Sequence, residues 1–353
     1  MKAFLVADSI FGQQIISLIH DIPQVDAIWI LCRNKSQHEE WTRKWLKIKG
    51  VYTEIKPICK ALQLAAKQCN NDSIAMSFIS VDEVVSSENL NQLEPSFMYT
   101  QIFKEIFLEM KYDAQAIKTL AGYWRELYNG NMNQLNIINE FKRNYRPERS
   151  IWWYTRECFT YEILNRALRN LEGDTIINMG FFIHDLHRQI EQLHKEQVSS
   201  YCGKSFVVYR GQTLLTVAYE KLRKTRGGLV SFNNFLSTSK SREVSLVFAE
   251  STLGKTDTVG ILFQITIDPS VTSTPFADIQ SVSYFEIEEE ILFSMHAVFR
   301  IGEITRIDDD NPLYQVALKL TADDDEQLRT LTERIQKEIA GPTGWERMGK
   351  LLL

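Results

Sequence analysis

The sequence lacks several features that would assign a protein to a function class at once. Its 353 residues include five cysteines, an odd number without the C-x-x-C spacing of a zinc site, so neither a zinc site nor a disulfide framework is expected. No apolar run approaches the roughly eighteen residues of a membrane span, and the apolar start of the chain ends at Asp8, so no signal peptide is expected. No lysine- or arginine-rich block offsets the net charge of -5, which argues against nucleic-acid binding. These absences predict a cytoplasmic protein with free thiols and no nucleic-acid or membrane partner.

The rest of the composition is that of an ordinary folded protein. Hydrophobic residues make up 44% of the chain and charged residues 24%. A chain of this length is expected to form about two or three domains. Changes of pattern along the sequence predict three units, over residues 1–88, 89–322 and 323–353.

The first unit has the alternating pattern of an α/β domain. Short apolar runs of strand length alternate with segments of helical spacing; the runs cover residues 4–6, 27–31, 51–55 and 74–79. This order predicts a small doubly wound parallel sheet that resembles a receiver domain in outline. The G-x-G-x-x-G phosphate loop is absent after the first run, where Gly12 is the only glycine. We therefore interpret residues 1–88 as a docking or regulatory module.

The second unit begins with helices, after a turn-rich passage at residues 80–95. Five segments have helical spacing, over residues 95–110, 114–128, 132–143, 154–171 and 175–195. In the last of them, His184 and His187 are three apart, but Asp185 is the only further ligand nearby. We interpret them as two surface histidines and expect no metal site.

From residue 203 the pattern turns to strands, and three polar motifs sit on them. Arg210-Gly211 ends the first strand, Ser237-Thr238-Ser239 ends a strand over 232–239, and Glu288-x-Glu290 leads into a strand at 291–295. A strand period of two puts Glu288 and Glu290 on one face, where two carboxylates can share acid–base or charge-stabilising work. Taken alone, these acids also fit an exposed edge strand that is blunted by charge.

In this order, the three motifs resemble the Arg, Ser-Thr-Ser, Glu-x-Glu signature of the mono-ADP-ribosyltransferases related to clostridial toxins and to vertebrate arginine-specific enzymes. The resemblance covers roughly residues 206–320. It implies an α+β ADP-ribosyltransferase fold, with a helical lobe at 95–200 followed by a two-sheet β core at 203–320. It also implies a glycosyl transfer from NAD, as co-substrate and without a metal, to an acceptor protein with an arginine target.

The resemblance assigns the chemistry to the glutamates and the hydroxyl motif. It makes Glu290 the catalytic residue, which stabilises the oxocarbenium-like transition state formed when the bond between ribose and nicotinamide breaks. It makes Glu288 the residue that orients and deprotonates the incoming guanidinium. Ser237 would bind the catalytic glutamate and the ribose, while Thr238 and Ser239 shape the NAD-binding strand.

The resemblance also assigns binding roles. Arg210 would contact the phosphate or ribose side of NAD through its planar fork of donors. Gly211 would let the backbone approach the nicotinamide amide. Tyr284 and Phe285, just before the glutamates, would touch the acceptor protein.

Two other functions remain open at this stage. The same residues would serve an NAD glycohydrolase, in which water replaces the acceptor, and an inactive descendant would keep the fold as a binding module. The chain lacks the signal peptide and paired cysteines of secreted vertebrate members, which argues against an extracellular role. The tail, with Trp345, Met348 and Gly349, resembles the opening of a tetratricopeptide repeat and predicts a partner-binding extension of repeats.

Overall fold

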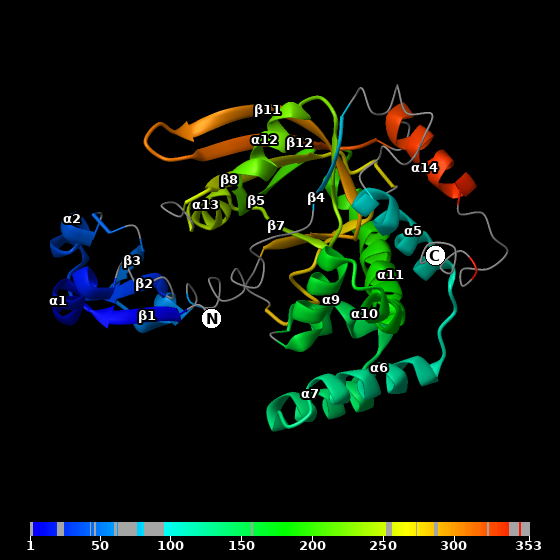
Figure 1. The fold of residues 1–353 in the computed structure, drawn as a ribbon, viewed down its shortest axis with the longest axis horizontal. Helices are drawn as coiled ribbons and strands as arrows, with labels where there is room; N and C mark the ends of the chain where they lie inside the picture. The colour runs from blue at the N-terminus through cyan, green and yellow to red at the C-terminus, as the bar shows by residue number, and fades with distance from the viewer. Residues whose placement is uncertain are drawn as a thin grey trace.

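The fold is described from a computed structural model (Figure 1). The structure describes residues 3–19, 25–42, 44–45, 47–59, 62, 76–80, 95–156, 158–251, 256–272, 274–285, 289–322, 325–338 and 346. The predicted repeat at the C-terminus lies outside these residues except for Glu346, so it stays a prediction. None of the described helices is long and apolar enough to cross a membrane.

The N-terminal unit contains a parallel sheet, as expected. Its strands are β1 (Ala3–Asp8), β2 (Val25–Leu31) and β3 (Ile48–Tyr52), in the order β1-β2-β3, with helices α1 (Ser9–Ile19) and α2 (Glu39–Thr42) between them. Ile16 of α1 packs against Ile28 and Ile30 of the central strand, and all three are almost fully buried. Among the described strands, the order does not reverse as a doubly wound sheet requires.

The strand at 74–79 was expected to close this N-terminal sheet, and that expectation is wrong. Strand β4 (Met76–Ile79) pairs antiparallel with β6 (Leu229–Phe232), at the edge of the large C-terminal sheet. Phe78 packs in the core of that sheet, and Ile79 packs in the core beneath the helices. A four-residue apolar run carries no information about which sheet it joins, so only burial on both faces could be predicted.

The helical lobe follows the sequence pattern closely. Its helices are α5 (Pro95–Glu109), α6 (Ala114–Leu127), α7 (Met132–Asn144), α8 (Ser150–Thr155), α9 (Phe159–Asn170), α10 (Gly173–Asn178) and α11 (Gly180–Gln197). The first three match their predicted ranges to within a residue or two, since Pro95 begins α5 and capping residues set the starts of α6 and α7. Asp113, for example, accepts hydrogen bonds from the backbone N–H groups of Gln115 and Ala116. The last two predicted helices are each broken into two, as α8–α9 and α10–α11.

Within the described residues, the β core forms one hydrogen-bonded sheet of nine strands. Its order is β4-β6-β11-β12-β8-β5-β7-β10-β9. The strands not yet named are β5 (Phe206–Leu215), β7 (Leu236–Ser239), β8 (Thr258–Ile267), β9 (Phe276–Asp278), β10 (Glu290–Phe293), β11 (Ala297–Asp308) and β12 (Leu313–Leu320). Helices α12 (Thr216–Lys224), α13 (Arg242–Glu250) and α14 (Glu326–Glu338) lie around it (Figure 1).

The expectation of two sheets is wrong for the described strands, because β5 and β7 join them into one ladder, although this joint is weak. Strands β5 and β7 pair through a single residue pair, Tyr209 with Ser239, while β5 and β8 pair along their whole length. The three strands β7, β10 and β9 therefore form a nearly separate group. One predicted strand over 232–239 is in fact two, β6 and β7, because the buried Asn233 and Asn234 lie between them and carry the chain from one group to the other.

The two faces of β10 look toward different parts of the molecule. Leu292 packs with the helical lobe, whereas Ile291 and Phe293 pack in the core between the two strand groups. Because side chains alternate along a strand, Glu290 shares the face of Leu292. The catalytic candidate therefore points toward the side of the sheet that the helices cover.

Candidate active site

Two neighbouring strands bring the hydroxyl motif beside Glu290. In the antiparallel pair β7–β10, Glu290 is opposite Ser239 and Leu292 is opposite Ser237. Residues directly opposite one another share a face, so Ser237, Ser239 and Glu290 lie on one surface and are partly exposed there. Thr238 points the other way, is buried, and donates a hydrogen bond of 2.8 Å to the carbonyl of Ile291. Its role is to hold β7 on β10.

Arg210 reaches this surface from β5. Its Nη1 donates a hydrogen bond of 2.7 Å to the carbonyl oxygen of Ser237, and its Nε donates one of 3.3 Å to Oε1 of Gln212. The residue is only 8% exposed. Burial lowers the pKa of the Arg210 guanidinium from its usual value, and the negative charge of Glu290 acts in the opposite direction. The structure thus brings together Arg210, Ser237 and Glu290, from three different strands.

A buried polar network, which the sequence reasoning missed, supports the site from the helical side. Nδ2 of Asn234 donates to Oδ1 of Asn165 at 2.9 Å, and Nδ2 of Asn165 lies 3.2 Å from Oη of Tyr154. Burial raises the pKa of Tyr154 well above its usual value, and Glu290 and Arg210 are both close enough to act on it. The signal available in the sequence was a polar Asn165 within the apolar stripe of residues 159–171.

Tyr161 is a second residue that the sequence reasoning passed over. It lies on α9, its ring centroid is 5.1 Å from that of Tyr154, and it acts electrostatically on Arg210. It is four residues before Asn165, so both side chains lie on one face of the helix. The α9 face with Tyr161 and Asn165 therefore forms the wall opposite the strands.

Gly211 has a packing reason to be glycine. A Cβ atom built there would lie 1.7 Å from the backbone oxygen of Ser245 and 2.7 Å from the backbone nitrogen of Ala249, both on α13. The sequence predicts that nicotinamide approaches the backbone of Gly211 closely, and the structure shows that helix α13 approaches it closely. Its role at NAD stays a prediction.

The loop before Glu290 is described only in part. Glu288, together with residues 286–287, lies outside the described residues, so its expected position on the face of Glu290 stays a prediction. Tyr284 is 43% exposed, and its backbone N–H donates a hydrogen bond of 2.9 Å to Oγ1 of Thr155 on α8. Its ring lies against Trp152, at 5.2 Å between centroids, and against Phe285, at 5.0 Å. This exposed position suits the acceptor contact that the sequence predicts.

Comparison with known proteins identifies the fold that carries this surface. Residues 135–324, more than half of the chain, match the family described as ADP-ribosyltransferase exoenzyme. The chain belongs to this family. Membership in this family supports NAD-dependent ADP-ribosylation as the general activity of the chain, with NAD as a substrate.

Solved structures of ADP-ribosyltransferases are also similar to it. Plx2a, a toxin from Paenibacillus larvae, is 16% identical, with a TM-score of 0.38 over 57% of this chain and 95% of that one. Vis toxin from Vibrio splendidus is 17% identical, with a TM-score of 0.34 over 63% and 92%. The C3 exoenzyme of Clostridium limosum is 13% identical, with a TM-score of 0.37 over 61% and 97%. No curated protein matches the sequence.

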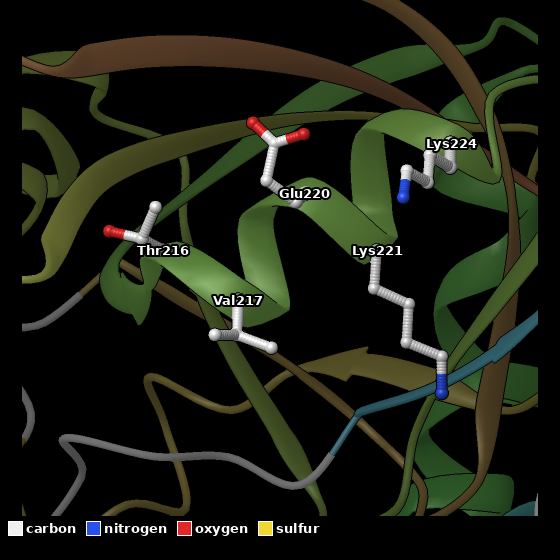
Figure 2. A pocket seen from close by; sticks show the side chains of 5 residues that line it. All are labelled: Thr216, Val217, Glu220, Lys221 and Lys224. Carbon is white, nitrogen blue, oxygen red and sulfur yellow. The ribbon is translucent and has the colours of Figure 1, made fainter.

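Two hollows on the transferase lie outside this constellation. One, of about 690 Å³, is bordered by the ion pair of Lys240 with Asp278 (2.6 Å), on the reverse face of the strands that carry Glu290. The other, of about 410 Å³, contains none of the predicted site residues (Figure 2). It is lined by Thr216, Val217, Glu220, Lys221 and Lys224 of α12.

The histidines of α11 are not a surface pair. His187 is 5% exposed, and its Nδ1 lies 2.6 Å from Oγ of Ser294, so the expectation of two surface histidines is wrong for this residue. The helical stripe of residues 183, 186, 187 and 190 turns it inward, because His187 shares the face of apolar neighbours. The described residues contain no group of three or more side chains that would hold a metal ion.

Proposed function

We propose that this transferase moves ADP-ribose from NAD to an arginine side chain of an acceptor protein and releases nicotinamide. The observation that carries the proposal is the convergence of Arg210, Ser237 and Glu290 on one partly covered surface. A cationic fork, a hydroxyl and a carboxylate are the three groups that the reaction requires. They bind a diphosphate, hold a ribose hydroxyl and stabilise a developing sugar cation.

Glu290 is the residue that we assign to the sugar cation. When the bond from ribose to nicotinamide breaks, positive charge develops on the ribose, and a fixed carboxylate beside it lowers the barrier. Glu290 is held at the first position of β10, opposite Ser239, so its backbone is fixed by the sheet. Ser237 on the same face is two residues away along β7 and is assigned to the glutamate and the ribose.

Arg210 is assigned to the phosphate or ribose side of NAD. Of the five N–H donors of a guanidinium, the carbonyl of Ser237 and the side chain of Gln212 take two. These two bonds fix the plane of the group, and the remaining donors are assigned to an anionic ligand. An arginine preorganised in this way binds a phosphate with little further loss of side-chain entropy.

Arginine as the acceptor rests on Glu288, two residues before Glu290 in the sequence. A guanidinium has a pKa above about 12, so a carboxylate must orient it and take a proton as it attacks. The bond that forms joins a guanidino nitrogen to the anomeric carbon of ribose, the bond that breaks releases nicotinamide, and the guanidino proton passes to Glu288. With water in place of arginine, the same site would be an NAD glycohydrolase.

The test is incubation of the protein with labelled NAD and agmatine, a small guanidino amine, followed by separation of nicotinamide, free ADP-ribose and ADP-ribosyl-agmatine. We expect Glu290→Gln to lose about a hundredfold to a thousandfold in nicotinamide release, the scale seen when a transition-state charge stabiliser is removed. We expect Glu288→Gln to lose transfer to agmatine while it continues to release free ADP-ribose.

Glu289→Gln is the matched control, because Glu289 lies between the two assigned residues and is exposed. It should keep wild-type rates for both products. Full turnover by Glu290→Gln would overturn the mechanism. Free ADP-ribose as the only product of the wild type would replace the transferase by a glycohydrolase.

A further inference from the structure

An aromatic surface beside the active site already holds guanidinium groups of the protein itself. The surface consists of Trp152 on α8 with Tyr284 and Phe285 of the loop before the glutamates. The guanidinium carbon of Arg149 lies 4.3 Å from the centroid of the Trp152 ring, and that of Arg156 lies 5.2 Å from it. An indole face attracts cations more strongly than other side-chain rings do.

The two arginines differ in how firmly they are held. Arg156 lies among several rings, including Tyr284 at 5.9 Å, and forms an ion pair of 2.9 Å with Glu140. Its side chain is only 18% exposed, so we take Arg156 as a fixed part of the packing that a ligand does not displace. Arg149 is exposed, and the interaction that the structure shows for its side chain is the contact with Trp152. An exposed contact of this kind is weak, so another guanidinium can displace it.

The helix that carries this surface also borders the active site. Tyr154, two residues after Trp152, acts electrostatically on both Glu290 and Arg210. Residues two apart on a helix are separated by about 200° around its axis, so Trp152 lies on the opposite side of this short helix from Tyr154. Thr155 ties the loop of Tyr284 to this helix. The aromatic surface therefore lies on the helix that borders the site and on the loop that precedes the glutamates.

We propose that Trp152, together with Tyr284, binds the guanidinium of the acceptor arginine before transfer, and that Arg149 occupies this surface until the acceptor displaces it. This inference rests on the proposed arginine transfer and adds a specificity-determining residue from the helical lobe. It also makes Arg149 a competitor of the acceptor arginine for the Trp152 ring. A planar guanidinium stacks on a ring as a flat group, which an ammonium ion cannot do, so the surface selects arginine over lysine.

The experiment measures the KM for agmatine and the KM for NAD in the same transfer reactions. Trp152→Ala should raise the KM for agmatine by about five- to thirty-fold, the range that corresponds to about 1–2 kcal/mol of lost cation–π attraction. The KM for NAD should rise by less than about twofold, because NAD is bound on the strand side. Trp152→Phe, which keeps an aromatic face, should recover most of the wild-type value for agmatine.

Arg149→Ala tests the competition directly, and because Arg149 is exposed the variant is expected to fold. It should lower the KM for agmatine by about two- to five-fold. Arg143→Ala is the matched control, since Arg143 is an exposed arginine whose side chain contacts only a helix carbonyl among the described residues, and it should change neither constant.

The outcomes separate this inference from the proposed function. If the wild type transfers to agmatine but Trp152→Ala keeps the wild-type KM, or Arg149→Ala leaves it unchanged or raises it, the inference is wrong and the function stands. If the wild type cleaves NAD without transfer to agmatine, the proposed arginine transfer fails, and the inference fails with it.

Discussion

Nη1 of Arg210 donates a hydrogen bond of 2.7 Å to the carbonyl oxygen of Ser237, and this bond joins β5 to β7 where the backbones barely meet. The ladder between these strands has one residue pair, Tyr209 with Ser239. The side chain of Arg210 thus completes a joint in the sheet and sets the position of the hydroxyl motif. One residue serves both the fold and the proposed NAD site.

The first prediction concerns Arg210→Lys. A lysine keeps the charge but has no planar fork, so it cannot hold the carbonyl of Ser237 and a phosphate together. We expect the KM for NAD to rise about tenfold to a hundredfold, which corresponds to the loss of one charge-assisted hydrogen bond of about 1.5–3 kcal/mol. Arg226→Lys is the control, because Arg226 forms an exposed ion pair with Glu303 and should leave the KM unchanged. A KM within twofold of the wild type for Arg210→Lys would contradict the assignment.

The strand-borne candidates could be recognised in the sequence, and their roles stay predictions. Arg210, Ser237 and Glu290 come from motifs whose residue types and order are visible there, and the structure places them on neighbouring strands. The helical wall was not predictable in the same way. Tyr154 and Asn165 sit in apolar stripes, where a polar side chain is usually taken as packing, and their partner Asn234 is far away in sequence. Only the tertiary fold brings them together.

The second prediction concerns Gly211→Ala. The new methyl group would meet the backbone of α13 at Ser245, which cannot move like the end of a side chain. We expect the free energy of unfolding to fall by about 3 kcal/mol or more, with a Tm lower by about 6–12 °C. The matched control is Gly122→Ala in α6, where nothing lies within 4 Å of the new Cβ. That substitution should raise stability by about 0.5–1 kcal/mol. Thermal unfolding followed by circular dichroism measures both, and an unchanged Tm for Gly211→Ala would show that α13 does not lie on β5 as described.

The third prediction concerns the buried network of Asn165. Asn165→Ala removes one of two partners of the buried Asn234 amide, which keeps the backbone carbonyl of residue 165, and one partner of the buried Tyr154 hydroxyl. We expect a loss of about 2–3 kcal/mol in stability, because buried polar groups are left with fewer hydrogen bonds. The KM for NAD should also rise, since Asn234 begins the turn into the strand of Ser237. Asn178→Ala, at a partly exposed helical asparagine whose side chain donates to the carbonyl of Asp174, should change stability by less than about 0.5 kcal/mol. Urea unfolding gives the stabilities, and equal values for the two variants would exclude a structural role for the network.

Element types were easier to predict than their partners. The helices at 95–110, 114–128 and 132–143 were found because their apolar spacing and their ends are local properties of the chain. Strand β4 was assigned to the wrong sheet, and β6 and β7 were read as one strand. Both errors concern which distant strand a short apolar run pairs with, and the sequence of the run does not specify that partner. The bend at Asn233 needed two buried amides, which composition alone marks as surface residues.

Three of the described histidines are buried, and two of them, His187 and His296, can be charged only at a cost. His296 is 2% exposed, its ring lies 4.6 Å from that of Phe97, and neither ring nitrogen has a hydrogen-bond partner among the described residues. Burial, and to a lesser extent the positive charge of Lys104, lowers the pKa of His296 well below its usual value. Burial, with Lys104 as the next cause, also lowers the pKa of His187, to about 3.

The fourth prediction is a loss of stability in acid that His296 helps to cause. In the unfolded chain both histidines bind a proton below about pH 6.5, whereas the folded chain leaves them neutral, so the unfolded state binds more protons and the free energy of unfolding falls as pH falls. Each contributes a slope of up to about 1.4 kcal/mol per pH unit. The test variant is His296→Asn, because asparagine tolerates the left-handed backbone of this residue at φ 56°. We expect this variant to reduce the dependence of the free energy of unfolding on pH by up to about 1.4 kcal/mol per pH unit between pH ~6 and pH ~5. Urea unfolding at several pH values measures it. A variant slope equal to that of the wild type would mean that His296 binds its proton in the folded state.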